Sequence, residues 1–142
     1  MCPDTVLPEL GQTLGDALLA VHRSYLKPIR ALMAAGLLRG AAHITGGGIT
    51  ENLPRVLNAS CRARIDLDAW KLPAIFQWLR INGGVEESEM LRTFNCGVGM
   101  IVCVAEEDEA AALEKLRESG ERPFVLGKLI PGEPGVSYTG RL

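Results

Sequence analysis

The sequence lacks several features that would place it in a specialised class of protein. Aromatic residues make up only 5% of it, and no stretch approaches the roughly 18 consecutive apolar residues that a membrane-spanning helix requires. The first residues, Met1 to Asp4, lack the basic and apolar regions of a secretory signal peptide. We therefore expect a cytoplasmic protein without a membrane segment.

Cysteine and histidine are also scarce, and their spacing argues against the usual zinc sites. The four cysteines stand at positions 2, 61, 96 and 103, no two of them have C-x-x-C spacing, and only two histidines accompany them. A structural zinc site is therefore not expected, and no metal ligand is assigned. Because no export signal is present, we expect the thiols to be reduced.

What the sequence does contain indicates an ordinary globular domain. Its 142 residues include 15 basic and 17 acidic side chains, and the formal net charge of −2 argues against a general nucleic-acid binder. A hydrophobic content of 47% suits a single domain with a buried core. The 16 glycines exceed average usage, which directs attention to places where the backbone approaches a ligand or another element.

Hydrophobic periodicity predicts a mixture of helices and strands. Helices are expected over 14–21, 28–36, 49–57, 73–83, 85–91 and 106–119. Strands are expected over 61–67, over 97–105 as a central strand buried on both faces, and over 124–130 and 136–139 as a hairpin closed by a Pro-Gly turn. This order, without regular βα alternation, predicts an α+β fold in which helices pack on a mixed β-sheet. Residues 1–9 are expected to be a linker or tail and residues 10–142 the domain.

The sharpest local feature is the run of three glycines at positions 46–48. Three residues without a Cβ allow successive N–H groups to converge on an anion, and a helix beginning directly afterwards adds its own free N–H groups. Arg55 offers a bidentate partner for a phosphate or carboxylate, whereas Glu51 disfavours an anion unless it points away. The alternative interpretation is a flexible connection or a tight crossing between elements. No Gly-Lys-Ser/Thr follows, so this is not a Walker loop.

Two polar residues flank the glycines, and each has two interpretations. His43 can hold a phosphate or transfer a proton near neutral pH, or it can simply pack at a strand end. Asn52 can bind a ligand or cap its own helix. Residue type and spacing leave both alternatives open.

A second polar cluster, residues 92–95, precedes a strand that contains Gly97 and Gly99. Polar side chains beside a backbone with few side chains suit an edge that faces a ligand, although the two glycines also fit a bulge or close helix packing. Cys96 stands where a nucleophile is conceivable, but no local signature supports that role. We interpret it as a small buried thiol.

These two segments resemble motifs of one enzyme family. Residues 43–57 resemble the HITGGG-x-x-EN-x-PRVL motif of the phosphoribosylformylglycinamidine cyclo-ligases, also called AIR synthetases, and residues 89–100 resemble their EM-x-RTFNCGVGM motif. The order and spacing of the motifs match the family, and the resemblance runs from about Leu10 to the C-terminus. Two long motifs in register are highly specific.

The resemblance implies the C-terminal domain of an enzyme of purine biosynthesis. That enzyme closes formylglycinamidine ribonucleotide to aminoimidazole ribonucleotide with ATP and Mg²⁺, and the complete enzyme is usually a homodimer. The N-terminal domain, which binds most of the ATP and metal, has no counterpart in this sequence. We therefore expect a ribonucleotide substrate, a separate N-terminal ATP-binding domain as partner, no nucleic acid and no membrane, and no turnover by the chain alone.

The resemblance also suggests which residues form the site. The expected catalytic residues are His43 and Asn95, and the expected substrate- or phosphate-binding residues are Thr45, Gly46, Gly47, Gly48, Asn52, Arg55, Arg92 and Thr93. One departure from the family is Val21-His22, where a Pro-Thr pair is usual. Two alternatives stay open: a related ATP-dependent enzyme of the selenophosphate synthetase or thiamine-monophosphate kinase type, and a non-catalytic module that binds a ligand or a partner protein.

Overall fold

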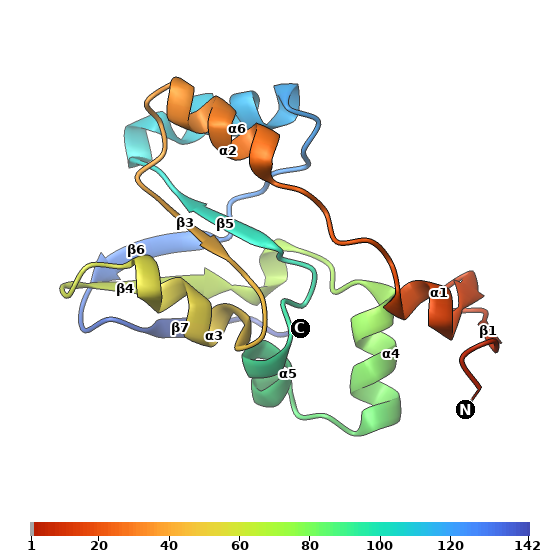
Figure 1. The fold of residues 1–142 in the computed structure, drawn as a ribbon. Helices are drawn as coiled ribbons and strands as arrows, with labels where there is room; N and C mark the ends of the chain where they lie inside the picture. Colours follow the sequence, from red (N-terminus) through yellow and green to blue (C-terminus); the bar gives the residue numbers. More distant parts are fainter. Residues whose placement is uncertain (1) are drawn as a thin grey trace.

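Six α-helices and three small β-sheets make up the computed structural model, which describes residues 2–142 (Figure 1). The helices are α1 (Leu14–Leu18), α2 (Leu26–Ala34), α3 (Gly48–Asn52), α4 (Ala74–Gly83), α5 (Glu87–Thr93) and α6 (Glu109–Glu118), with 3₁₀ turns η1 (Leu53–Val56), η2 (Leu67–Ala69) and η3 (Glu106–Asp108). The strands are β1 (Val6–Leu7), β2 (Gln12–Thr13), β3 (Gly40–His43), β4 (Cys61–Asp66), β5 (Met100–Cys103), β6 (Gly127–Pro131) and β7 (Val136–Thr139). This is the α+β class that the sequence predicts.

Strand β4 is the centre of a mixed three-stranded sheet with the order β6-β4-β7. It pairs antiparallel with β6 and parallel with β7, so that Ile65 lies opposite Gly127 on one side and Tyr138 on the other. The predicted alternation is confirmed, because Ala63 and Ile65 are buried whereas Arg64 and Asp66 are exposed. One face of β4 therefore contributes to the core.

The predicted hairpin between the last two strands is wrong. Strands β6 and β7 do not pair with each other, because β4 lies between them. The loop from Gly132 to Gly135 wraps around the beginning of β4, where Gly132 donates to the carbonyl of Ser60 and Gly135 accepts from Ala63, both at 3.0 Å. A Pro-Gly segment predicts that the chain turns, but it does not reveal whether the chain returns beside the same strand or crosses to its far edge.

Two further predictions need correction. The apolar run 97–105 forms only the four-residue strand β5, which pairs with β3 in a separate two-stranded sheet, so it is not a central strand buried on both faces. The helix expected over 14–21 ends at Leu18, and Val21 is 97% exposed. Leu14 is buried, but Leu18 is 57% exposed, so only the beginning of the apolar stripe is packed. A short helix gains little stability where tertiary packing is missing.

Local signals place the other helix ends well. Pro28 lies in the first turn of α2, and Gly36, with a φ of 71°, follows its last turn while Leu37 donates back to the carbonyl of Leu32. Gly84 ends α4 in the same left-handed conformation. Helices α2 and α6 pack against each other in a layer beside the β3–β5 pair (Figure 1).

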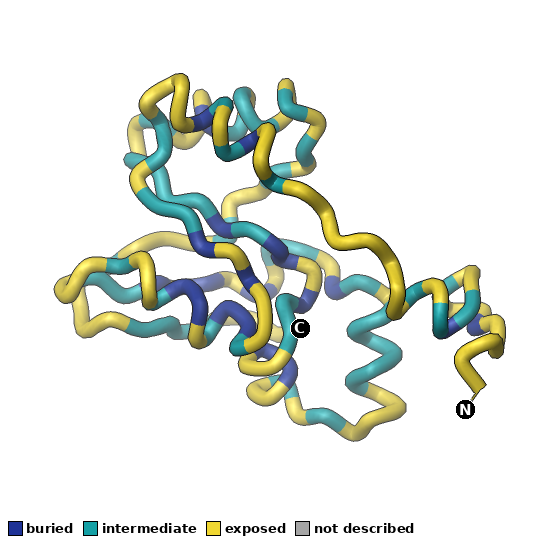
Figure 2. Tube along the Cα trace, viewed as in Figure 1, coloured by how far each residue is buried: buried dark blue, intermediate teal, exposed yellow. Residues whose placement is uncertain are grey.

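The main core lies where α3, β4 and the β3–β5 pair meet (Figure 2). Ile44 and Ile49 are completely buried there, and Leu53 is 1% exposed. The segment expected to be a tail contains β1, which pairs with β2 to form a small hairpin beside α1. Residues 19–25, which join that hairpin unit to α2, are almost entirely exposed (Figure 2).

We expect Ile65→Ala to lower the free energy of unfolding by about 2–5 kcal/mol, because it removes buried methyl groups and leaves a cavity in the core. Its exposed neighbour on the same strand provides a control, and Arg64→Ala should change stability by no more than about 0.5 kcal/mol. Urea unfolding followed by circular dichroism measures both. Equal losses would contradict the assignment of the two faces of β4.

Candidate functional site

The triglycine run forms the entrance to α3. Gly47 is the residue before the helix, with a φ of 96°, and Gly48 begins it with a φ of 57°. The N–H of Gly48 donates to the carbonyl of Thr45 at 3.0 Å and closes a tight turn. Within residues 2–142, the N–H groups of Gly46 and Gly47 donate to no acceptor. Two backbone donors of the loop are therefore left for a ligand.

Gly48 also allows two helices to touch. A Cβ at this position would overlap the carbonyl oxygen of Leu91 and come within 2.8 Å of that of Phe94. The same substitution at Gly46 would meet nothing within 4 Å. The two interpretations of the glycine run thus apply to different residues. Gly48 allows a tight crossing between elements, whereas Gly46 faces open space and leaves room for a ligand.

Asn52 holds the loop in shape from inside the protein. Among the described residues, Asn52 is the polar residue that is buried in the core. Its Nδ2 donates to the carbonyls of Thr45 (3.4 Å), Gly46 (3.1 Å) and Gly48 (2.8 Å). Its Oδ1 accepts from the guanidinium of Arg55 at 3.3 Å. Asn52 is the last residue of α3, so it does not cap the beginning of its own helix. The sequence did not predict this role of Asn52, because the hydrogen bonds to the loop depend on how the chain folds around the side chain.

The charge beside the loop is mixed. The carboxylate of Glu51 lies close to Gly47, since a Cβ there would be 2.8 Å from its Oε2. Arg55 is exposed at the other side of Asn52. An anion at the loop would therefore meet both an attractive guanidinium and a repulsive carboxylate, which must turn away when an anion binds.

The second motif ends α5 and turns towards β5. Two exposed polar residues at the end of this helix, Arg92 and Thr93, both contact Glu89. The carboxylate of Glu89 accepts a hydrogen bond from the hydroxyl of Thr93 at 3.0 Å and lies 3.4 Å from the guanidinium of Arg92. Asn95 turns the chain by accepting the N–H of Gly97 through its Oδ1 at 2.9 Å. Its Nδ2 forms no hydrogen bond within the described part of the chain and is left to donate to a ligand.

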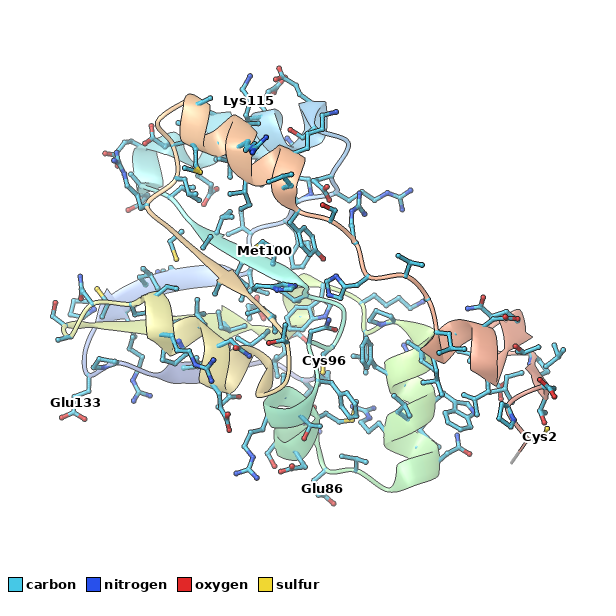
Figure 3. All side chains as sticks on the ribbon, viewed as in Figure 1. Cys2, Glu86, Cys96, Met100, Lys115 and Glu133 are labelled. Atoms are coloured by element: carbon cyan, nitrogen blue, oxygen red, sulfur yellow. The ribbon has the colours of Figure 1, made fainter. Side chains whose placement is uncertain are left out.

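Cys96 is part of the structure and not a nucleophile. The side chain is fully buried, and its Sγ donates to the carbonyl of Met90 at 3.4 Å (Figure 3). Its own carbonyl accepts from the indole of Trp70 at 2.9 Å. Burial raises the pKa of the Cys96 thiol to about 11, against which the positive charge of Arg80 acts only weakly. The prediction of a small buried thiol is confirmed.

Two hydrogen bonds join the two motifs, and a third connects the first motif to β7. The N–H of Ile44 donates to the carbonyl of Gly99 at 2.9 Å, directly before the glycine loop. The hydroxyl of Thr50 contacts the carbonyl of Leu91 at 3.2 Å and the phenol of Tyr138 at 2.8 Å. The sites predicted from two distant segments thus belong to one region, in which α3 packs on α5 and the ends of β3 and β5 adjoin.

A cavity of about 1020 Å³ lies elsewhere, between β5 and α6 on one side and the β4–β6 pair on the other. Its lining includes residues 97–99 of the second motif but not the glycine loop. We place the candidate site at the loop, because the free backbone donors are there and the second motif packs against Gly48.

The residues of this chain do not fit a Mg²⁺ site. Among residues 2–142 no group of three or more His, Cys, Asp or Glu side chains is arranged to hold a metal ion, and Glu51 is the acid next to the loop. The loop does offer donors to one phosphate group, but no step through ATP or Mg²⁺ follows from these residues alone. In the part of the chain that the structure describes, no helix is both long and apolar enough to cross a membrane.

Comparison with known proteins agrees with the two motifs. A profile of the family described as AIR synthase related protein, C-terminal domain, matches residues 3–139. Phosphoribosylformylglycinamidine cyclo-ligases from two strains of Burkholderia pseudomallei, 1710b and K96243, are each 46% identical over 137 residues, which is 96% of this chain and 39% of the relative. The chain therefore spans well under half the length of these relatives.

A solved structure shares the fold. The hydrogenase maturation protein HypE of E. coli aligns with a TM-score of 0.63 and 17% sequence identity, over 90% of this chain and 41% of HypE. At that identity the likeness concerns the fold alone.

We expect Gly48→Ala to lower the free energy of unfolding by about 3 kcal/mol or more, because the new methyl group meets backbone carbonyls and the φ is positive. Gly46→Ala is the matched control two residues away, and it should change stability by no more than about 0.5 kcal/mol. Urea unfolding of both variants is the measurement. A harmless Gly48→Ala would show that α3 and α5 do not touch there.

Cys96 should resist alkylation in the folded protein at pH 8, whereas the exposed Cys2 reacts. Peptide mapping after iodoacetamide treatment, with and without urea, identifies the modified thiols.

The buried thiol also makes the stability of the protein depend on pH, because the pKa of Cys96 is higher in the folded protein than its ordinary value of 9.0. The stability that this thiol contributes is therefore fully present below pH 9 and is lost as the pH rises towards 11. Rapid labelling of native Cys96 would refute this account.

Proposed function

The chain belongs to the family of AIR synthase related proteins, as their C-terminal domain, and on this premise we propose that it forms part of a phosphoribosylformylglycinamidine cyclo-ligase. The reaction is the ATP-dependent closure of formylglycinamidine ribonucleotide to aminoimidazole ribonucleotide. The observation that carries the proposal is 46% identity to two such enzymes over 96% of this chain. The packing of both family motifs around α3 and α5 supports it.

Within this reaction, the glycine loop would bind a phosphate group of the ribonucleotide or of ATP. The support for this role is the pair of free N–H groups at Gly46 and Gly47 and the nearby guanidinium of Arg55. Thr45 belongs to the same loop, and Asn52 and Gly48 hold its shape. Donors fixed in this way need no reorganisation when charge develops on a transferred phosphoryl group.

His43 and Asn95 would act on the reacting part of the substrate. His43 is exposed at the end of β3 and would serve as the general acid or base of the reaction. Asn95 presents a free amide donor from the turn that its own Oδ1 fixes. Arg92 and Thr93 would join them once a ligand displaces their contacts with Glu89.

The remaining chemistry would come from the part of the relatives that this chain does not match. With Glu51 as the acid at the loop, the domain supplies no convincing set of Mg²⁺ ligands. We therefore propose that ATP and Mg²⁺ bind mainly to an N-terminal domain, that the assembled enzyme is a cytoplasmic homodimer, and that the isolated chain has no cyclo-ligase activity.

The test is a chimera of the B. pseudomallei relative in which residues 3–139 of this chain replace the matching segment. The chimera should form aminoimidazole ribonucleotide from formylglycinamidine ribonucleotide and ATP, whereas the isolated chain should not. In the chimera, Asn95→Ala should lower kcat/KM by about tenfold or more, because a donor to the reacting substrate is lost.

The control is Arg117→Gln, which removes an exposed cation from α6, outside both motifs, and should leave kcat/KM unchanged. The intact relative serves as the positive reference. A folded chimera that binds its substrates without turnover would refute the proposal and favour a non-catalytic binding module. Activity that survives Asn95→Ala unchanged would refute the role of that residue alone.

A further inference from the structure

The fold brings the two histidines of the sequence into contact, although they come from separate segments. His22 lies in the exposed connection between α1 and α2, and His43 ends β3. Their ring centres are 5.1 Å apart, and the ring planes are nearly perpendicular at 89°. Tyr25 packs against both rings, with ring centres 6.0 Å from His22 and 6.1 Å from His43.

Tyr25 fixes this contact to the body of the protein. Its hydroxyl occupies the space that a Cβ at Gly99 would fill, so the absence of a side chain at Gly99 allows the tyrosine to lie on the end of β5. Figure 1 shows the connection between α1 and α2 passing this end of the β3–β5 pair. The histidine pair is therefore placed by tertiary contacts, even though both imidazoles are exposed.

The hydrogen bond of His22 determines which nitrogen is free. Its Nδ1 lies 2.9 Å from the carbonyl oxygen of Arg23. A carbonyl can only accept, so Nδ1 carries the hydrogen, and the lone pair of the neutral ring is on Nε2. Metal-binding histidines are commonly oriented in this way, by donation from the other nitrogen to a backbone carbonyl.

Among the described residues, no charged side chain forms an ion pair with either imidazole. Neither histidine forms an ion pair with a carboxylate. The neighbouring cation, Arg23, is drawn away by Glu121 at 3.1 Å and by the carbonyl of Gly120 at 3.2 Å. Both imidazoles are exposed and are thus accessible to a ligand from solvent.

We propose that His22 and His43 form an open two-histidine site for a divalent transition-metal ion of the Zn²⁺, Ni²⁺ or Cu²⁺ class. Imidazole nitrogen suits these ions, whereas Mg²⁺ prefers oxygen ligands. Two imidazoles that share one tetrahedral ion at the usual Zn–N distance of about 2.0–2.1 Å have ring centres about 5 Å apart. The observed separation matches that arrangement.

The remaining coordination positions would be filled by water or by an anionic group bound at the adjoining glycine loop. This site does not depend on the proposed cyclo-ligase activity, although it shares His43 with that proposal, and it differs from an ATP-linked Mg²⁺ site in ligand type. C-x-x-C or His-x-x-x-His spacing would not reveal it, because its two ligands meet only in the folded chain.

The test is calorimetric titration of the full chain with ZnCl₂ and NiCl₂, in a Cys2→Ser background that removes the exposed thiol. We expect one ion per chain and no heat from MgCl₂. His22→Gln and His43→Gln should each weaken binding by about tenfold or more, because each removes one of two protein ligands. The control variant Arg117→Gln should bind as the parent does, and urea unfolding should show that all variants are folded.

A spectroscopic readout separates a shared ion from two independent sites. The chain has two histidines, so its NMR spectrum contains two imidazole Cε1–H signals, and both should shift together as Zn²⁺ is added. In His22→Thr, which restores the residue usual in the family, the remaining signal of His43 should shift much less at the same Zn²⁺ concentration. Unchanged affinity in His22→Gln, or a shift of one signal alone, would overturn the proposal.

Discussion

The contact between α3 and α5 is the constraint on which the candidate site depends. It is close because Gly48 has no side chain, and the carbonyls of Leu91 and Phe94 lie where a Cβ would stand. Once α3 is seated there, Thr50 donates to Leu91 and reaches Tyr138, which connects the helix to the three-stranded sheet. Two motifs that are distant in the sequence become one surface through this packing.

The glycine loop serves the structure and, in our proposal, also the binding of a phosphate group. Its left-handed conformation and its close packing belong to Gly47 and Gly48, whereas Gly46 faces open space. The buried amide of Asn52 donates to three carbonyls of the loop, so their polar groups are satisfied from inside the protein. The N–H groups of Gly46 and Gly47 have no acceptor among the described residues, so they remain available to an anion.

The mixed charge beside the loop accords with our proposal that this domain forms part of a larger site. Glu51 stands close to the same glycines that offer donors, and it lowers their attraction for an anion. A cation or a conformational change contributed by another domain would offset that repulsion. This agrees with the finding that the chain spans 39% of the length of its relatives.

The sequence by itself determined the local features: the helix ends at Gly36 and Gly84, the alternating face of β4, and the two motifs that identify the family. These depend on the conformation of single residues and on short-range periodicity, which are present in any stretch of chain. Only the tertiary structure decided that β4 separates β6 from β7, that β5 pairs with β3 alone, that Asn52 fixes the glycine loop, and that His22 meets His43. Each of these depends on which distant segments pack together, and that choice is made by the burial of surface across the whole chain.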